Sequence, residues 1–379
     1  MFKRVLITGG AGFIGSNMAL KLINQGYVVT VLDNLSEQIH GTNAEKTSPL
    51  FNSIKNKVTF IKGSVTDRRV WEQALVDQDA VIHLAAETGT GQSMYDIQKY
   101  IDVNIGGTGI LLDILANKEY VVKKIVVASS RAIYGEGKYE CLTHGFVYPK
   151  ERSESDLSKG EFECKCNICN QNLILHATSE DSLIHPTSIY GITKQTQEQM
   201  VLVAGKALGI PAVAFRYQNV YGPGQSLKNP YTGILSIFST QIKNGNPINI
   251  FEDGKESRDF IYIDDIVDAT ILGLEKEIAN YEVFNVGYGE ATDVITIAKK
   301  LRDSYNSSID INISGNYRIG DIRHNYADMS KTEKLLGFQA KWDFSKGVDE
   351  FCKWVNTQEV ASDKFSESIT ELKEKGLFK

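Results

Sequence analysis

The first fifteen residues constrain the fold of this chain more than any other stretch. The apolar run Val5-Leu-Ile-Thr8 leads into glycines and then into a helical pattern of apolar residues. Three of these glycines stand at three-residue spacing: Gly9, Gly12 and Gly15. This order predicts a buried strand, a tight turn and a helix. Because glycines have no side chains, the backbone of such a turn lets a pyrophosphate lie against the N-terminus of the helix.

The next predicted strand, residues 28–32, leads into Asp33. An acid in this place can hydrogen bond the ribose of an adenosine, and it repels the additional phosphate of NADP. We therefore expect the chain to bind NAD rather than NADP.

Strand-like and helix-like stretches alternate through the first half of the chain. Residues 58–62, 80–84 and 124–128 have the pattern of buried strands, and helical patterns separate them, including a long one over 94–117. Alternation of this kind predicts an α/β fold with a Rossmann-type, doubly wound parallel sheet. After Gly224 the elements become shorter and more aromatic, which indicates a smaller C-terminal α/β lobe that binds substrate.

Three regions follow from this pattern. We expect an NAD-binding domain from residues 1–135 and 186–228, with returns near 261–287, an insert at 136–185, and a mostly substrate-binding lobe at 229–379. The formal net charge of −6 argues against a nucleic-acid or membrane-surface partner. The chain runs straight into a strand and has no apolar stretch of membrane-spanning length, so we expect a cytoplasmic protein.

A phenol and an ammonium stand four residues apart in Tyr190-Gly-Ile-Thr-Lys194, in a predicted helix that continues to about Leu208. Residues at this spacing share one face of a helix. A lysine one turn away favours the phenolate and lowers the pKa of the phenol, so Tyr190 can take a proton from a sugar or alcohol hydroxyl. The spacing also occurs by chance on surface helices, so it needs support from other motifs.

Together, the glycine turn and the Tyr-Lys pair resemble the extended short-chain dehydrogenase/reductase family, which includes the nucleotide-sugar epimerases and dehydratases. The resemblance covers nearly the whole chain. It implies an enzyme with tightly bound NAD that acts on a nucleotide-diphosphate sugar, and a homodimer. It also implies that Ser130, four residues before the tyrosine of Ile133-Tyr134-Gly135, completes a catalytic triad with Tyr190 and Lys194.

The residues after Ser130 separate neighbouring chemistries. In the dehydratases of this family an Asp-Glu pair follows the Ser/Thr, whereas this chain has Arg131-Ala132. Without a carboxylic acid to protonate the leaving hydroxyl, elimination of water lacks its catalyst. The resemblance therefore implies a 4-epimerase, which oxidises C4 to a ketone and reduces it from the opposite face.

The family pattern also implies binding residues. The run His83-Leu-Ala-Ala86 and the Asn104-x-x-Gly-Thr segment match stretches that lie along the cofactor, whereas Ser64 departs from the usual Asp. The implied cofactor contacts are Gly9, Gly12, Phe13, Ile14, Gly15, Asp33, Asn34, Ser64, Val65, Leu84, Ala85, Ala86, Asn104, Tyr190 and Lys194. The implied substrate contacts are Thr88, Arg131, Asn219, Arg258 and Arg323. Among these, Asn219, Arg258 and Arg323 would anchor the diphosphate, because guanidiniums suit bidentate capture of phosphate.

The insert contains four of the five cysteines. Cys141-Leu-Thr-His144 and Cys166-Asn-Ile-Cys169 have the spacing of a zinc ribbon, and a closed tetrahedral site of this kind could fold an insert that lacks a core of its own. We expect a structural zinc ion on Cys141, His144, Cys166 and Cys169, with Cys164 as an alternative to His144. The other interpretation is a set of reduced thiols.

The insert and its flanking residues resemble one branch of the family, the dTDP-L-rhamnose 4-epimerases. This resemblance implies a dTDP-6-deoxyhexose such as dTDP-L-rhamnose as substrate. UDP-hexose or UDP-N-acetylhexosamine 4-epimerisation remains an alternative. A 4,6-dehydratase, a 4-keto reductase and a non-catalytic NAD sensor are further alternatives.

Overall fold

The computed structural model describes residues 3–229, 231, 233–360, 362–363 and 365–379. Its centre is a seven-stranded parallel sheet in the order β14-β9-β5-β4-β1-β2-β3. The strands are β1 (Arg4–Thr8), β2 (Val28–Asp33), β3 (Thr59–Lys62), β4 (Ala80–His83), β5 (Lys124–Ser130), β9 (Ala212–Tyr217) and β14 (Val283–Val286). The α/β fold with a doubly wound parallel sheet, predicted from the sequence, is confirmed.

The sheet reverses its order between β1 and β4. From β1 the chain adds β2 and β3 on one side, and from β4 it adds β5, β9 and β14 on the other. Most strand residues are buried, as expected for strands covered by helices on both faces. A crevice opens at such a reversal, outside the carboxyl ends of the strands, and that is where folds of this class bind ligands.

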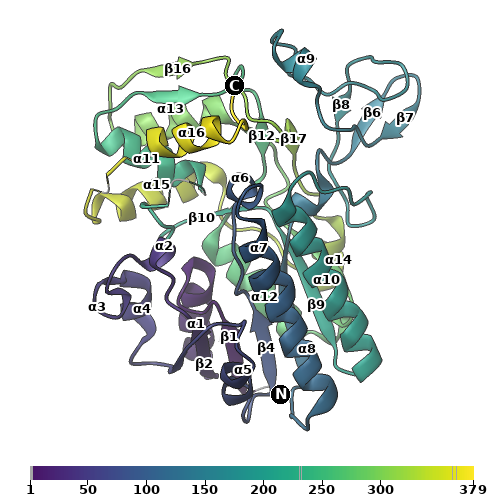
Figure 1. Ribbon diagram of the computed structural model, residues 1–379, viewed down its shortest axis with the longest axis vertical. Helices are drawn as coiled ribbons and strands as arrows, with labels where there is room; N and C mark the ends of the chain where they lie inside the picture. Colours follow the sequence, from purple (N-terminus) through teal and green to yellow (C-terminus); the bar gives the residue numbers. More distant parts are fainter. Residues whose placement is uncertain (1–2, 230, 232, 361, 364) are drawn as a thin grey trace.

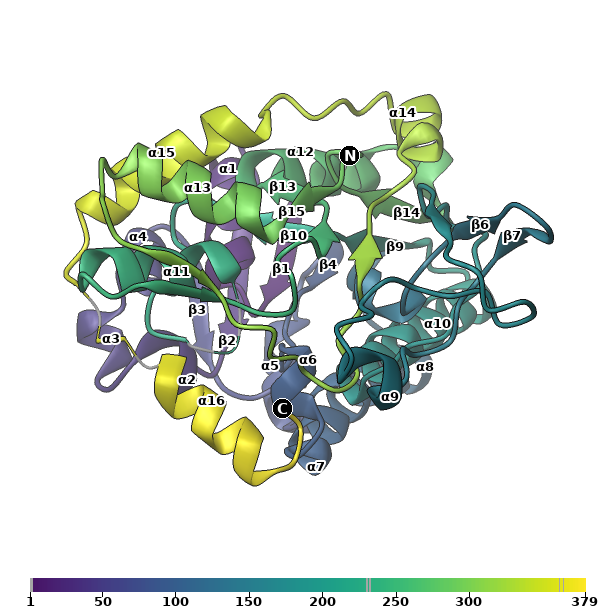
Figure 2. The same ribbon diagram turned by 90° about the horizontal axis from the view of Figure 1, so that it is seen from above.

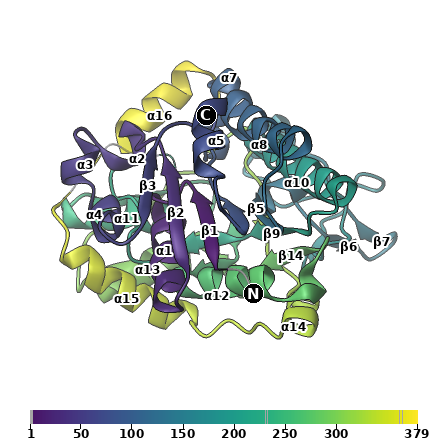
Figure 3. The same cartoon turned by 90° about the horizontal axis from the view of Figure 1, so that it is seen from below.

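Helices cover both faces of the sheet (Figure 3). α1 (Phe13–Asn24) and α12 (Ile263–Glu275) pack together on one face, and α5 (Arg68–Ala74), α8 (Gly107–Asn117) and α10 (Ile189–Leu208) lie on the other. Shorter helical segments are α2 (Glu37–His40), α3 (Ala44–Thr47), α4 (Pro49–Ile54), α6 (Thr90–Ser93), α14 (Ser330–Leu336), and the 3₁₀ turns η2 (Arg131–Tyr134) and η3 (Glu277–Ala279). None of the helices in the described ranges has the length and apolar character to cross a membrane.

The long helical pattern over 94–117 is not one regular α-helix. It consists of α7 (Ile97–Tyr100), a π-helical turn η1 (Ile101–Gly106) and α8. The Thr108 hydroxyl donates to the backbone oxygen of Asn104 at 2.6 Å within this region. A side chain that enters the backbone ladder commonly accompanies such a bulge, and π-bulges are frequent at functional sites.

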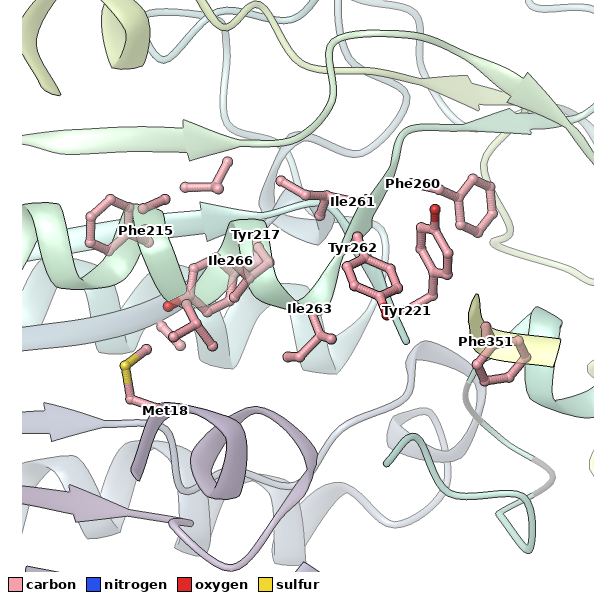
Figure 4. Packing of buried hydrophobic residues seen from close by; sticks show 14 of the residues in the cluster. Met18, Phe215, Tyr217, Tyr221, Phe260, Ile261, Tyr262, Ile263, Ile266 and Phe351 are labelled. Atoms are coloured by element: carbon pink, nitrogen blue, oxygen red, sulfur yellow. The ribbon is translucent and has the colours of Figure 1, made fainter. Parts of the chain in front are cut away.

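The second lobe lies beyond the carboxyl edge of the sheet (Figure 1). Its strands form small sheets: β10 (Asn219–Tyr221) with β13 (Phe260–Tyr262), β11 (Ile248–Ile250) with β16 (Ile311–Ile313), and β12 (Ser257–Arg258) between β15 (Thr292–Asp293) and β17 (His324–Asn325). Its helices are α11 (Ile234–Lys243), α13 (Val294–Ser304), α15 (Phe344–Asn356) and α16 (Phe365–Glu374). The rings of Tyr221, Phe260 and Tyr262 pack edge to face where this lobe meets the first (Figure 4).

The insert forms a small unit beside the second lobe (Figures 1 and 2). It contains the antiparallel strands β6 (Tyr139–Cys141), β7 (Gly145–Val147) and β8 (Ile174–Leu175), and the short helix α9 (Glu154–Leu157). Its hydrophobic cluster is small, because Leu157 and Phe162 of the insert pack only with Tyr317 of the second lobe in the described residues. The insert therefore depends on polar contacts for much of its order.

Candidate active site

A cavity of about 480 Å³ opens along the carboxyl edge of the sheet. It gathers residues that the sequence analysis placed in separate motifs: Gly9, Gly12, Phe13, Ile14, Gly15, Asp33, Asn34, Ser64, Val65, Leu84, Ala85, Ala86, Thr88, Ser130, Arg131, Tyr190, Lys194 and Asn219. Three of the cofactor and substrate contacts expected from the sequence do not line this cavity as the described residues form it: Asn104, Arg258 and Arg323.

The glycine turn brings bare backbone to one end of the cavity. Gly9 has φ +64°, and a Cβ on it would lie 2.9 Å from Cα of Ala85. A Cβ on Gly15 would lie 2.3 Å from the backbone oxygen of Gly9, so only glycine lets the start of α1 pack this closely. No side chain caps α1, and its first turn contains no acid. The turn therefore fits a bound pyrophosphate.

Asp33 ends β2 inside the same cavity. Its Oδ2 accepts from the Ala11 N–H at 3.0 Å and its Oδ1 from the Leu35 N–H at 2.8 Å. Each carboxylate oxygen can accept a further hydrogen bond, which fits a ribose hydroxyl. His40 lines the cavity beside it, with Nε2 3.8 Å from Oδ1 of Asp33, and no sequence motif pointed to this histidine. Burial raises the pKa of Asp33, whereas the Leu35 N–H and the charge of His40 lower it.

Tyr190 and Ser130 meet where α10 begins and β5 ends. The Ser188 side chain caps α10 by accepting from the Gly191 N–H at 3.1 Å, and the Tyr190 N–H donates to Oγ of Ser93 at 3.0 Å. Burial raises the pKa of Tyr190, whereas a hydrogen bond with Ser130 and the charge of Arg131 lower it. The sequence analysis assigned this lowering to Lys194, which is not among the groups that lower the pKa here.

Lys194 lies one turn along the same face of α10 and lines the cavity. Its side chain is almost fully enclosed, and its Nζ donates to Oε1 of Gln197 at 2.9 Å. Burial lowers the pKa of Lys194 to about 7, and the carboxylate of Glu198 opposes that shift. The ammonium therefore titrates near neutral pH.

Arg131 and Asn219 form a polar pair in the lining of the cavity. Nε of Arg131 donates to Oδ1 of Asn219 at 2.8 Å. Burial and the nearby charge of Arg258 lower the pKa of Arg131 to about 9, so the guanidinium stays positive at neutral pH.

Arg258 and Arg323 have partners within the protein. Nη2 of Arg258 donates to Oδ1 of Asp321 at 3.1 Å and to the Ile322 backbone oxygen at 2.6 Å. Arg323 is fully buried and donates to Glu163, Glu252 and Asp253 over distances of 2.5–3.0 Å. Capture of a diphosphate, expected for both residues, would require them to leave these partners. The acids stand in distant loops, so the sequence pattern did not reveal the pairing.

Asn104 is buried behind the cavity wall. Its Oδ1 accepts from the Glu87 N–H at 2.8 Å, and its Nδ2 donates to the Glu87 backbone oxygen at 3.1 Å and to Thr193 Oγ1 at 2.9 Å. In this conformation Asn104 braces the segment after β4 against α10.

The Cys/His residues of the insert converge on one point. The ligand atoms of Cys141, His144, Cys166 and Cys169 all lie within 4.8 Å of one another. Sγ of Cys141 is 3.5 Å from Nδ1 of His144 and 3.6 Å from Sγ of Cys169, and Sγ of Cys166 is 3.6 Å from Nδ1 of His144. Cys164 stands apart and bonds the Tyr139 hydroxyl at 3.5 Å, so the structure places His144 in the cluster and Cys164 outside it.

Comparisons with known proteins agree with this geometry. The model of the family described as "NAD dependent epimerase/dehydratase family" matches residues 5–159 and 170–287, and the unmatched gap contains Cys164, Cys166 and Cys169. The chain is 35% identical to a dTDP-L-rhamnose 4-epimerase of Burkholderia thailandensis, over 93% of this chain and 95% of that protein.

Solved structures have the same fold. A Thermotoga maritima UDP-glucose 4-epimerase with UDP-glucose superposes with a TM-score of 0.76 at 29% identity, over 93% of this chain and 98% of the other. A Bacillus cereus UDP-glucuronic acid 4-epimerase in complex with UDP-glucuronic acid and NAD gives a TM-score of 0.75 at 28% identity, over 93% and 99%.

Proposed function

The chain belongs to the NAD-dependent epimerase/dehydratase family, and from this membership we propose that it inverts C4 of a nucleotide-diphosphate sugar through a transient 4-keto intermediate. The observation that carries the proposal is one cavity that contains the glycine turn, Asp33, Ser130, Tyr190 and Lys194. The similar proteins named above are themselves nucleotide-sugar 4-epimerases.

The chain's own residues divide the work of the reaction. Ser130 orients the 4-hydroxyl, and Tyr190 takes its proton and later returns it. Residues 9–15 and Asp33 would hold NAD, which when bound accepts hydride from C4 and supplies it again to the opposite face. Lys194 would contact the cofactor, and the hydrogen bond of Ser130 and the charge of Arg131 would favour the Tyr190 phenolate. Arg131 and Asn219 would anchor the diphosphate as the sugar turns over.

We propose a dTDP-6-deoxyhexose such as dTDP-L-rhamnose as the substrate. The similarity to the Burkholderia thailandensis enzyme over nearly the full length of both proteins supports this choice. The structural neighbours that carry UDP-sugars support the second candidate, a UDP-hexose. Arg131 in place of an acid argues against a dehydratase.

Incubation with dTDP-, UDP- and GDP-hexoses in deuterated water, with no added cofactor, tests the reaction. We expect a C4 epimer without deuterium, because hydride leaves and returns to the same carbon without exchange with solvent. A 4-keto product with deuterium at C5 or C6 would instead establish a dehydratase. Reduction of an added 4-keto sugar nucleotide that requires NADPH would establish a reductase, and NAD binding without turnover of any sugar would favour a sensor.

We further propose that the Cys/His cluster binds a structural zinc ion. Around zinc, ligand bonds of about 2.0–2.3 Å give tetrahedral edges of about 3.4–3.8 Å. The three distances between ligand atoms of 3.5–3.6 Å fit that size. Reduced thiols, as kept in the cytoplasm where we propose that the protein acts, are the form that binds zinc.

Elemental analysis tests the metal. We expect one zinc per chain in the parent protein and in Cys164→Ser, and a loss of zinc with a lower Tm in Cys166→Ser. Cys164→Ser is the matched control, because this cysteine lies in the insert but outside the cluster. Zinc-free parent protein, or full zinc retention in Cys166→Ser, would disprove the assignment.

A homodimer is the final part of the proposal. Exposed apolar side chains occur on α7, η1 and α10: Ile97, Ile101, Ile192 and Val203. A second copy that packs on these elements would bury them. We expect sedimentation at twice the chain mass, and a monomer for the double variant Ile192→Glu, Val203→Glu.

A further inference from the structure

The Lys194 ammonium depends on one amide. Lys194 is 3% exposed and Gln197 is 0% exposed, and Nζ donates to Oε1 of Gln197 at 2.9 Å. Across the described residues, this is the side-chain acceptor that the structure gives Lys194. Because an ammonium has donors only, the oxygen of the amide must face it.

A chain of hydrogen bonds fixes the orientation of that amide. Nε2 of Gln197 lies 2.8 Å from Oγ1 of Thr108. The Thr108 hydroxyl donates its own proton to the Asn104 backbone oxygen at 2.6 Å, so Oγ1 is left to accept. Gln197 therefore turns its NH₂ toward Thr108 and its oxygen toward Lys194, and the reversed amide would lose both contacts.

The imidazole of His83 completes the same chain. Its Nε2 lies 2.9 Å from Thr108 Oγ1, which can only accept, so Nε2 carries the proton. Its Nδ1 then accepts from the Thr8 hydroxyl at 2.7 Å, and Thr8 Oγ1 accepts from the Ala85 N–H at 3.1 Å. A single assignment of protons therefore satisfies all the hydrogen bonds of this chain. Burial lowers the pKa of His83 to about 3, so this ring stays neutral across the working pH range.

The charged groups around Lys194 do not replace this acceptor. Glu198 follows on α10, but its two oxygens bind the Arg216 guanidinium of β9 at 2.6 and 3.0 Å. Toward the cavity stand Tyr190 on α10 and the positive Arg131 on η2, and from β4 comes the neutral His83. The amide oxygen of Gln197 therefore supports the charge on Lys194 by direct contact, and the carboxylate of Glu198 supports it through its own charge.

We propose that Gln197 is a positioning residue of the epimerase reaction, which holds the Lys194 ammonium in its charged form in the cavity through the Thr8–His83–Thr108 chain. This inference rests on the proposed function, in which a charged Lys194 contacts the cofactor. Because the pKa of Lys194 lies near 7, loss of one acceptor changes the fraction of charged lysine where the enzyme works.

The alkaline limb of the pH profile tests the role. Gln197→Met keeps the volume and removes the acceptor, so we expect kcat to decline at a pH about one unit lower than in the parent. Gln197→Glu adds a negative acceptor, so the limb should move to higher pH. Thr196→Val is the matched control, because among the described residues the partly buried Thr196 hydroxyl donates to the Ile192 backbone oxygen at 2.9 Å and does not contact Lys194. The control should keep the parent profile.

A titration without turnover separates this inference from the proposed function. In protein with ¹³C-labelled lysine, the signal absent from Lys194→Met identifies Lys194 by NMR. We expect its pKa to fall by about one unit in Gln197→Met and to rise in Gln197→Glu. Equal Lys194 titration in all three proteins would overturn the role of Gln197, even if the enzyme epimerises sugars. Absence of turnover in the parent would overturn the proposed function and leave the titration result intact.

Discussion

Two buried cations of this molecule have opposite surroundings. Lys194 lies in the cavity with one neutral amide as its side-chain acceptor, and burial lowers its pKa to about 7. Arg323, between the insert and the second lobe, faces Glu163, Glu252 and Asp253. Burial acts to lower the pKa of Arg323, but hydrogen bonds with Asp253 and Glu163 outweigh it and raise the pKa.

Because of this difference, Lys194 can change its charge near neutral pH, whereas Arg323 cannot. A lysine with sparse partners titrates near the working pH, which suits a site that moves protons. An arginine among carboxylates is locked in one state and joins two parts of the chain. Activity should therefore depend on the first environment and stability on the second.

The largest effect should come from the phenol beside Lys194. Tyr190→Phe removes the proton acceptor, and we expect kcat to fall about 10²–10⁴-fold, the usual contribution of a general base. Turnover of the sugar substrate measures it. Tyr305→Phe is a matched control in the second lobe, outside the cavity lining, and should keep normal activity. Equal activity of Tyr190→Phe and the parent would remove Tyr190 from the mechanism.

Replacement of Arg323 should lower mainly the stability of the folded protein. Arg323→Met leaves buried carboxylates without their cation, and we expect about 3–5 kcal/mol less free energy of unfolding in urea titration. Arg302→Met, which removes an exposed partner of Asp303, should cost less than about 1 kcal/mol. Similar losses for the two variants would show that the buried network does not stabilise the fold.

The smallest expected effect is a gain in the free energy of unfolding when Lys194 is replaced. Lys194 is charged in the folded protein below about pH 7, whereas a lysine in an unfolded chain keeps its proton up to about pH 10.4. The cost of the buried charge is fully present below pH 7 and is relieved as the pH rises toward 10. The free energy of unfolding of Lys194→Met should therefore exceed that of the parent by about 1–4 kcal/mol at pH 6. The excess should be smaller at pH 9. Lys118→Met, at an exposed pair with Glu72, should show no such pH dependence.

The sequence revealed those parts of the site that depend on local pattern. The glycine spacing predicts the strand, turn and helix around Gly9, and Tyr190 and Lys194 stand on a helix that ends at Leu208, where the pattern placed it. The Cys-x2-His and Cys-x2-Cys pairs do meet, because each pair sits in one tight turn.

Contacts between distant segments were not visible. The orientation of the Gln197 amide depends on Thr108 and His83, which lie 89 and 114 residues away in the chain. Arg323 has the family's spacing, but its three acids belong to loops that no periodic pattern brings together. The π-helical turn at 101–106 was also missed, because the pattern of apolar residues continues through it.

The insert leaves and rejoins the first lobe at nearly one point. The His185 N–H donates to the Ile133 backbone oxygen at 3.0 Å, so some fifty residues of extra chain begin and end across a single hydrogen bond. The entropy of closing such a loop grows only slowly with its length. Exchange of the whole excursion for a short turn or a foreign domain would keep this closure but would remove Glu163 from Arg323. A reporter or a binding module grafted onto the insert therefore has to leave the segment that contacts Arg323 in place.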